Sequence, residues 1–146
     1  MRLLLDTNVL LLYLVGQIRP SQIGVKRLSS FTAEDFLKVA EWAAEFPRKH
    51  VSLPNILTEA SNLLGDAKQG FTPGIVALAK YVADLDEEYV PSLEVVGSKE
   101  YFVLGLTDAA IYKFADKGVC VISADYHLCS RLRAKNIDAR NPLNFR

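Results

Sequence analysis

Two acidic residues closely follow apolar segments that have the length and composition of buried strands. Asp6 comes directly after Leu3–Leu5, and Asp125 comes shortly after the apolar run Val119–Ser123. In parallel α/β sheets, functional groups gather at the carboxyl ends of the strands. We therefore expect the carboxylates of Asp6 and Asp125 to face one crevice.

Two further acidic residues fall on the apolar sides of predicted helices. Glu59 lies three residues after Ile56 and four before Leu63, which places it with the apolar stripe of its helix. Asp108 lies three residues before Ile111, again on the apolar side. A carboxylate on an inward face costs free energy unless a partner neutralises it, and neither stripe carries a basic residue at helical spacing. A divalent cation would satisfy all these carboxylates together.

The type of ligand decides the chemistry of such a site. Carboxylate oxygens without thiolates or a suitably placed histidine favour hard cations, so the predicted cofactor is Mg²⁺ or Mn²⁺. Such ions activate water, hold a phosphate group and neutralise charge on the leaving oxygen. Hydrolysis of a phosphodiester bond uses all three effects. The predicted catalytic residues and metal ligands are therefore Asp6, Glu59, Asp108 and Asp125.

Each carboxylate also has a structural interpretation that involves no metal. Asp6 and Asp125 can cap the helices that follow them. Asp108 can interact with the positive end of its own helix, and Glu59 can lie at the edge of its stripe and reach water. One shared cation explains the four positions together, whereas the structural interpretation needs four separate reasons.

The elements that position these residues alternate between short apolar runs and helical periods. The predicted strands are Leu3–Leu5, His50–Leu53, Pro91–Val96, Val119–Ser123 and Ile137–Ala139. The predicted helices run from Thr7 or Asn8 to Val15, from the cap Thr32 to Phe46, from Asn55 to Asp66, from Thr72 to Leu85, from Gly97 to Leu104, from the cap Thr107 to Lys117, and from Tyr126 to Ala134. The segment Gly16–Ser30 is expected to be irregular.

This alternation predicts the α/β class, with a mostly parallel sheet of about five strands. The apolar run Val119–Ser123 is typical of a strand that is covered on both faces. The length of 146 residues and the apolar content of 50% suit one domain over residues 1–146.

Net charge, cysteine content and the pattern of the N-terminus argue against several classes of protein. The formal net charge is zero, so no overall basic field attracts nucleic acid. The two cysteines, Cys120 and Cys129, form no CxxC pair, which argues against a zinc site and for a reducing cytoplasm. The apolar N-terminus is interrupted by Asp6, Thr7 and Asn8, so we expect neither a signal peptide nor association with a membrane.

The chain resembles the PIN domain in four ordered segments: LLLDTNVLL, LPNILTEASNLL, GLTDAAIYKFA and VISADYHL. The resemblance extends from Arg2 to Phe145. It implies a PIN-like three-layer α/β/α domain and divalent-metal-dependent endonuclease cleavage of RNA. Many bacterial and archaeal members are VapC-type toxins of type II toxin–antitoxin pairs. The resemblance therefore also implies RNA as the substrate, a small antitoxin protein as a partner, and a homodimer formed through apolar helix faces.

The resemblance also assigns roles to matching residues. The acidic residues of the family match Asp6, Glu59, Asp108 and Asp125. Its polar residues around the acids match Thr7, Asn8 and Ser123. We expect these polar side chains to orient the carboxylates, although Thr7 can be only a helix cap and Ser123 only the end of a strand.

Several functions remain open at this point. The chain can be a toxin, a PIN nuclease that processes RNA without being a toxin, or an inert binding module of the same fold. The long segment Gly16–Phe31 departs from a minimal toxin. It carries Arg19, Lys26 and Arg27, which can contact RNA or belong to a solvated loop.

A phosphatase with Asp6 as its nucleophile is a further alternative. Such enzymes commonly carry a second acidic residue two positions later, where this chain has Asn8. The sequence therefore favours the metal-dependent ribonuclease.

Overall fold

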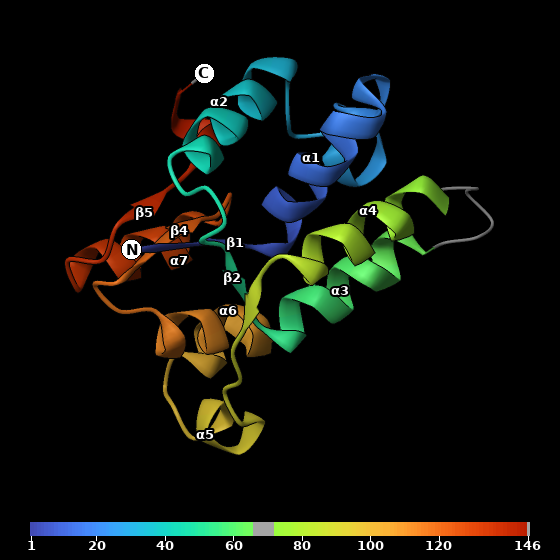
Figure 1. The fold of residues 1–146 in the computed structure, drawn as a ribbon. Coiled ribbons are helices and arrows are strands. Elements are labelled where there is room, and N and C mark those ends of the chain that lie inside the picture. Colours follow the sequence, from blue (N-terminus) through green and yellow to red (C-terminus); the bar gives the residue numbers. More distant parts are fainter. Residues whose placement is uncertain (66–71, 146) are drawn as a thin grey trace.

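Short parallel strands form the centre of the computed structural model, which describes residues 1–65 and 72–145 (Figure 1). They are β1 (Arg2–Leu5), β2 (Val51–Ser52), β3 (Asp86–Glu87), β4 (Val119–Ile122) and β5 (Ala139–Arg140). One sheet has the order β1-β4-β5, and β2 pairs with β3 in a second. Every pair is parallel, which confirms the α/β class and the predicted parallel pairing.

A bridge joins the two sheets side by side. Leu3 forms a parallel bridge with His50, and its amide nitrogen donates to the carbonyl oxygen of Lys49 at 2.8 Å. The strands therefore follow the spatial order β3-β2-β1-β4-β5. The chain proceeds from β1 to β3 in one direction and returns to β4 and β5 on the other side of β1. This reversal lies between β1 and β4, and open α/β sheets bind ligands at such a point.

The helices fall into two groups. They are α1 (Thr7–Ile18), α2 (Ala33–Ala44), α3 (Pro54–Leu64), α4 (Thr72–Ala83), α5 (Ser92–Val96), α6 (Tyr101–Phe114) and α7 (Tyr126–Ala134). Helix α1 contacts α2, α3 and α4, and α3 contacts α4; α6 contacts α5 and α7, and α3 also contacts α6. Figure 1 shows α1 and α2 above β1, with α5 and α6 below it.

Helices cover both faces of the central strands. Consecutive residues of a strand point to opposite faces, yet the whole of Leu3–Leu5 is at most 1% exposed, and so is Val119–Ile122. The prediction that the run at Val119 is covered on both faces is confirmed. These two rigid strands fix the positions of the residues that follow them.

Several predicted elements differ in the structure. Pro91–Val96 is not a strand, because Ser92–Val96 forms the helix α5, in which only Val95 is buried. The third strand is Asp86–Glu87 instead, which is exposed and pairs with β2. The segment Gly16–Phe31 begins inside α1 and continues through the short 3₁₀ helices Pro20–Gln22 and Lys26–Leu28. The predicted end of α3 at Asp66 lies outside the described residues.

For the cap of the first helix, the sequence left Asp6, Thr7 and Asn8 open. The structure shows Asp6 as the N-cap of α1. At the second helix, the predicted cap is confirmed, because Thr32 forms a reciprocal capping box with Asp35.

A glycine bends α6 just before the candidate site residues. The sequence predicts two helices here, the second beginning at Thr107, and α6 does consist of two helical stretches that meet at a kink, where Gly105 is non-helical with φ 82° and ψ 176°. This backbone region is essentially restricted to glycine. Gly105 therefore sets the direction of the turn that carries Thr107 and Asp108.

We expect Gly105→Ala to destabilise the protein by about 1–3 kcal/mol, the typical cost of a strained backbone conformation. An added Cβ at this position meets no atom within 4 Å, so the cost is backbone strain alone. Gly97→Ala is the matched control, because Gly97 has φ −78° and ψ −8°. Urea unfolding of the two variants measures the difference, and equal effects would contradict this account of the bend.

Candidate active site

Asp6 is held at the carboxyl end of β1 by three hydrogen bonds. Its backbone nitrogen donates to the carbonyl oxygen of Ile122 in β4 at 3.0 Å. Its Oδ1 accepts from the Thr7 nitrogen at 2.7 Å, and its Oδ2 accepts from Ser123 Oγ at 2.7 Å. The side chain is buried. The sequence prediction for Asp6 includes both of its roles, since it caps α1 and also faces the crevice between β1 and β4.

Ser123 connects the ends of β1 and β4. Its hydroxyl donates to Asp6 and accepts from the backbone nitrogen of Asp125 at 3.0 Å. Asp125 in turn caps α7, with Oδ1 accepting from the Leu128 nitrogen at 2.8 Å. Ser123 is fully buried. Through its two hydrogen bonds, its hydroxyl fixes the Asp6 side chain relative to the backbone that follows β4. Ser123 thus contacts the carboxylate of Asp6, and its orienting role at a metal site stays a prediction.

Glu59 reaches the same site from α3, but its burial differs from the prediction. The buried residues of α3 are Ile56, Ala60 and Leu64, and Glu59 is exposed. It lies at the edge of the apolar stripe, where its carboxylate meets two hydroxyl groups. Oε2 accepts from Thr7 Oγ1 at 3.1 Å, and Oε1 accepts from Thr107 Oγ1.

Thr107 is a site residue that the sequence prediction missed. It was expected to cap a helix, whereas its hydroxyl binds Glu59 from the middle of α6. The one signal in the sequence is its position directly before Asp108. The exposed Asn8 lines the pocket at the start of α1.

The four predicted acidic residues line one pocket of about 420 Å³. It lies at the carboxyl ends of β1 and β4, at the reversal of strand order. Its lining consists of Asp6, Thr7, Asn8, Arg27, Ser30, Phe31, Glu59, Leu63, Asp108, Ala124, Asp125 and Leu143. Arg27 is the one basic side chain in this lining, so the pocket carries an excess of negative charge.

The excess of negative charge affects the carboxyl groups of the pocket. Burial, together with the charges of Asp6, Asp125 and Glu59, raises the pKa of Asp108 from its ordinary value of 3.8 to about 8. Burial also raises the pKa of Asp6, although the hydrogen bonds from Ser123 and Thr7 oppose that shift. The carboxylates are therefore brought together at a cost that a cation would offset.

The donor chemistry of the pocket fits a hard cation. Carboxylate oxygens are the preferred ligands of Mg²⁺ and Mn²⁺, and each oxygen that accepts one hydrogen bond keeps a further lone pair. In residues 1–65 and 72–145, no three acidic, histidine or cysteine side chains are already grouped closely enough to hold an ion. The residues that could hold a metal thus share one pocket but are not preassembled as a ligand cluster.

Ser123→Ala is expected to weaken binding of Mn²⁺ by roughly 10- to 100-fold, the usual effect of removing a group that orients a ligand. The reason is that one hydroxyl fixes both Asp6 and the backbone of Asp125. Ser130→Ala, at an exposed position of α7, is the control. Calorimetric titration with Mn²⁺ measures both variants, and equal affinities would show that the hydroxyl has no such role.

Comparison with known proteins supports the fold alone. No protein-family model matches the chain, and no curated protein matches it. The chain is similar to the crystal structure of PAE2754 from Pyrobaculum aerophilum, with a TM-score of 0.58 and 16% sequence identity. The match covers 99% of this chain and 86% of that chain. Across residues 1–65 and 72–145, none of the helices has the length and apolar character needed to cross a bilayer.

Proposed function

We propose that the protein is a PIN-domain endoribonuclease that hydrolyses RNA phosphodiester bonds with Mg²⁺ or Mn²⁺. The observation that carries the proposal is the convergence of four carboxylates, from the ends of β1 and β4 and from α3 and α6, on one pocket. Two groups of helices on a parallel set of strands also support a PIN-like three-layer α/β/α arrangement.

In this proposal, the carboxylates of the pocket hold the cation, and the neighbouring hydroxyl groups orient the carboxylates. Asp6, Glu59, Asp108 and Asp125 would hold the cation, which supplies activated water and neutralises charge on the phosphate. Thr7 and Thr107 fix the carboxylate of Glu59. Ser123 fixes that of Asp6. Such fixed side chains reduce the reorganisation needed during the reaction.

The proton on Asp108 links the reaction to pH. With a pKa of about 8, this carboxyl group carries a proton near neutral pH in the metal-free protein. It must lose that proton to become a ligand. Arg27 lies in the lining of the same pocket and can balance the charge of an incoming phosphate group.

The proposal is tested with the purified full chain and a mixed pool of RNA. Cleavage is expected with Mn²⁺ or Mg²⁺ and is expected to stop when a chelator replaces the ion. Failure to bind Mn²⁺ in a calorimetric titration would favour the inert binding module of the same fold. Cleavage that persists in chelator would contradict the metal-dependent mechanism, and a phosphorylated Asp6 would indicate the phosphatase alternative.

We further propose that the nuclease acts in the cytoplasm as the toxin of a type II pair, with a small antitoxin that blocks the pocket. The two cysteines, Cys120 and Cys129, are free and buried, as is usual in a reducing compartment. The proposal predicts that a small protein encoded beside this chain inhibits its cleavage of RNA. Absence of such an inhibitor would favour the RNA-processing nuclease.

A homodimer is also part of the proposal. Leu93 of α5 is 82% exposed, and Phe102 and Val103 of α6 are 81% and 59% exposed. Apolar surface of this kind commonly marks a protein interface. Light scattering of wild type and Phe102→Ser tests this, since only the wild type is expected to be dimeric.

A further inference from the structure

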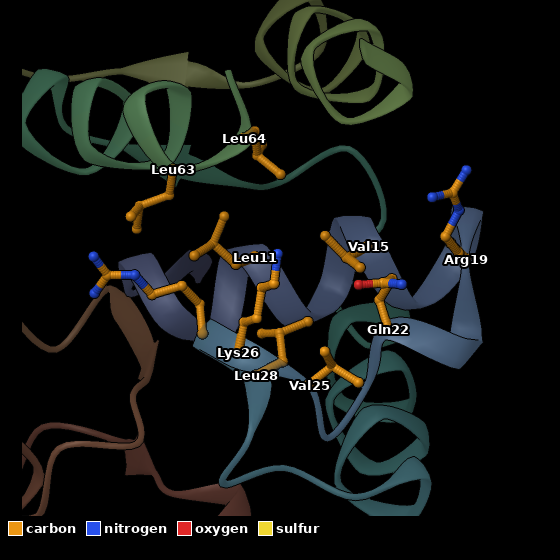
Figure 2. A pocket seen from close by; sticks show the side chains of 10 residues that line it. Leu11, Val15, Arg19, Gln22, Val25, Lys26, Leu28, Leu63 and Leu64 are labelled. Carbon is orange, nitrogen blue, oxygen red and sulfur yellow. The ribbon is translucent and has the colours of Figure 1, made fainter. Parts of the chain in front are cut away.

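A second pocket lies beside the acidic one and has the opposite charge. Its volume is about 290 Å³, and we call it the basic-rimmed pocket (Figure 2). Its lining consists of Leu11, Val15, Arg19, Gln22, Val25, Lys26, Arg27, Leu28, Leu63 and Leu64. Arg27 and Leu63 line both pockets, so a single ligand can extend from one into the other.

The basic-rimmed pocket combines an apolar floor with a positive edge. Its floor includes Leu11, Leu28 and Leu64, each at most 4% exposed. Figure 2 shows Leu63 and Leu64 facing Leu11 across the pocket. All the charged residues of its lining are basic. A ligand that fits this combination has a flat, weakly polar body next to a negative charge, and a nucleotide has both.

The polar side chains of the pocket belong to the segment between α1 and α2. Figure 2 shows Lys26 extending toward Leu11, while Gln22 lies near Val15. Lys26 has φ 51°, in the left-handed region that a lysine rarely adopts. Such a conformation persists where the surroundings determine it. Since Leu28 is buried at the end of the same 3₁₀ helix, the segment holds its basic residues in defined directions.

We propose that the basic-rimmed pocket receives an unpaired nucleotide of RNA that adjoins the bond to be cleaved. Its base lies on the apolar floor, the Gln22 amide binds the edge of the base, and Arg27 binds the phosphate that passes between the two pockets. This inference rests on the proposed ribonuclease function and adds the substrate class. A base that is paired in a duplex cannot enter, so the substrate is single-stranded RNA with a preferred base at one position beside the cut.

Three exposed or partly exposed positions allow the pocket to be altered without changing the core. Val25→Trp fills the pocket, Gln22→Leu removes the amide, and Arg27→Gln removes the shared charge. Val76→Trp in α4 and Lys117→Gln before β4 are controls of matched chemistry at exposed positions that line neither pocket. Circular dichroism of each variant checks that it is folded.

Two measurements separate binding from cleavage. The first is the anisotropy of a fluorescent single-stranded oligoribonucleotide of mixed sequence, with Ca²⁺ in place of the catalytic ion. We expect the pocket variants to bind roughly 5- to 100-fold more weakly than wild type, the range for loss of one hydrogen bond or charge contact to the nucleotide. The second is the sequence at the ends of products cut from a random RNA pool. We expect Val25→Trp and Gln22→Leu to lose a base preference that wild type and the controls share.

The outcomes distinguish this inference from the proposed function. Pocket-dependent binding of RNA without cleavage would support the pocket and remove the ribonuclease. Metal-dependent cleavage with unchanged affinity and base preference in the pocket variants would support the ribonuclease and overturn the pocket. Loss of affinity for a polyglutamate peptide, with RNA binding unchanged, would also overturn it and would assign the pocket to an acidic protein partner.

Discussion

Asp108→Asn is expected to abolish metal-dependent cleavage of RNA while the protein remains folded. Asparagine keeps the shape of the side chain but cannot supply a negatively charged ligand oxygen. The expected loss exceeds the roughly 10- to 100-fold that follows removal of an orienting group, because a ligand itself is lost. The measurement is the initial rate of cleavage of a fluorescent RNA at saturating Mn²⁺.

The control for this substitution is Asp116→Asn. Asp116 is exposed, and its Oδ1 accepts a hydrogen bond from the Gly118 nitrogen before β4, at the opposite end of the strand from the pocket. Asparagine preserves that acceptor, so wild-type activity is expected. Equal activity of Asp108→Asn and Asp116→Asn would remove Asp108 from the site.

The same Asp108→Asn substitution is expected to stabilise the metal-free protein as the pH rises. The pKa of Asp108 is raised from 3.8 to about 8 in the folded state. Between these values the folded protein holds a proton that the unfolded chain has released, so the free energy of unfolding of wild type falls with rising pH. The raised pKa of Asp6 acts in the same direction. Asparagine has no such proton and avoids the penalty.

Urea unfolding in chelator at about pH 5 and about pH 8 measures this effect. Near the upper pH we expect the variant to be more stable than wild type by roughly 1–4 kcal/mol, and near the lower pH by much less. Added Mn²⁺ is expected to reverse the order by stabilising only the wild type, with release of a proton on binding. Parallel pH profiles of the two proteins would contradict the raised pKa of Asp108.

Asp108 is thus expected to lower the stability of the metal-free protein while it is required for cleavage of RNA. A carboxylate that is needed only to hold a cation is a cost to the metal-free fold, because its neighbours repel it. A carboxylate with a structural role would show the opposite pattern, in which its replacement lowers stability. Asp108 is therefore the residue at which the metal hypothesis and the structural interpretation differ most clearly.

The positions of Asp6 and Asp125 were predictable because local rules determine them. Each follows a short apolar strand and caps the next helix, so strand patterning and capping chemistry agree. The helix Tyr126–Ala134 was predicted with the bounds that the structure shows. A helix or strand can be predicted from a single sequence where its local signals, such as capping and apolar patterning, agree with the contacts it makes in the fold.

Other features depend on contacts between distant segments and could not be predicted. The strand Asp86–Glu87 is exposed and has no apolar pattern, and it exists because β2 offers a pairing edge. The hydrogen bond from Thr107 to Glu59 joins residues that are 48 positions apart. Glu59 was assigned to the inward stripe because spacing alone cannot separate the edge of a stripe from its centre.

Cleavage of an RNA pool by wild type and by Asp6→Asn, in Mn²⁺, Mg²⁺ or chelator, tests whether the pocket is a metal-dependent ribonuclease site. Asp6 is the carboxylate that both strand ends fix, through Ile122 and Ser123. We expect cleavage by the wild type with either ion, none in chelator, and none by the folded variant in any condition. Undiminished cleavage by Asp6→Asn, or wild-type cleavage in chelator, would contradict a ribonuclease site built on these carboxylates.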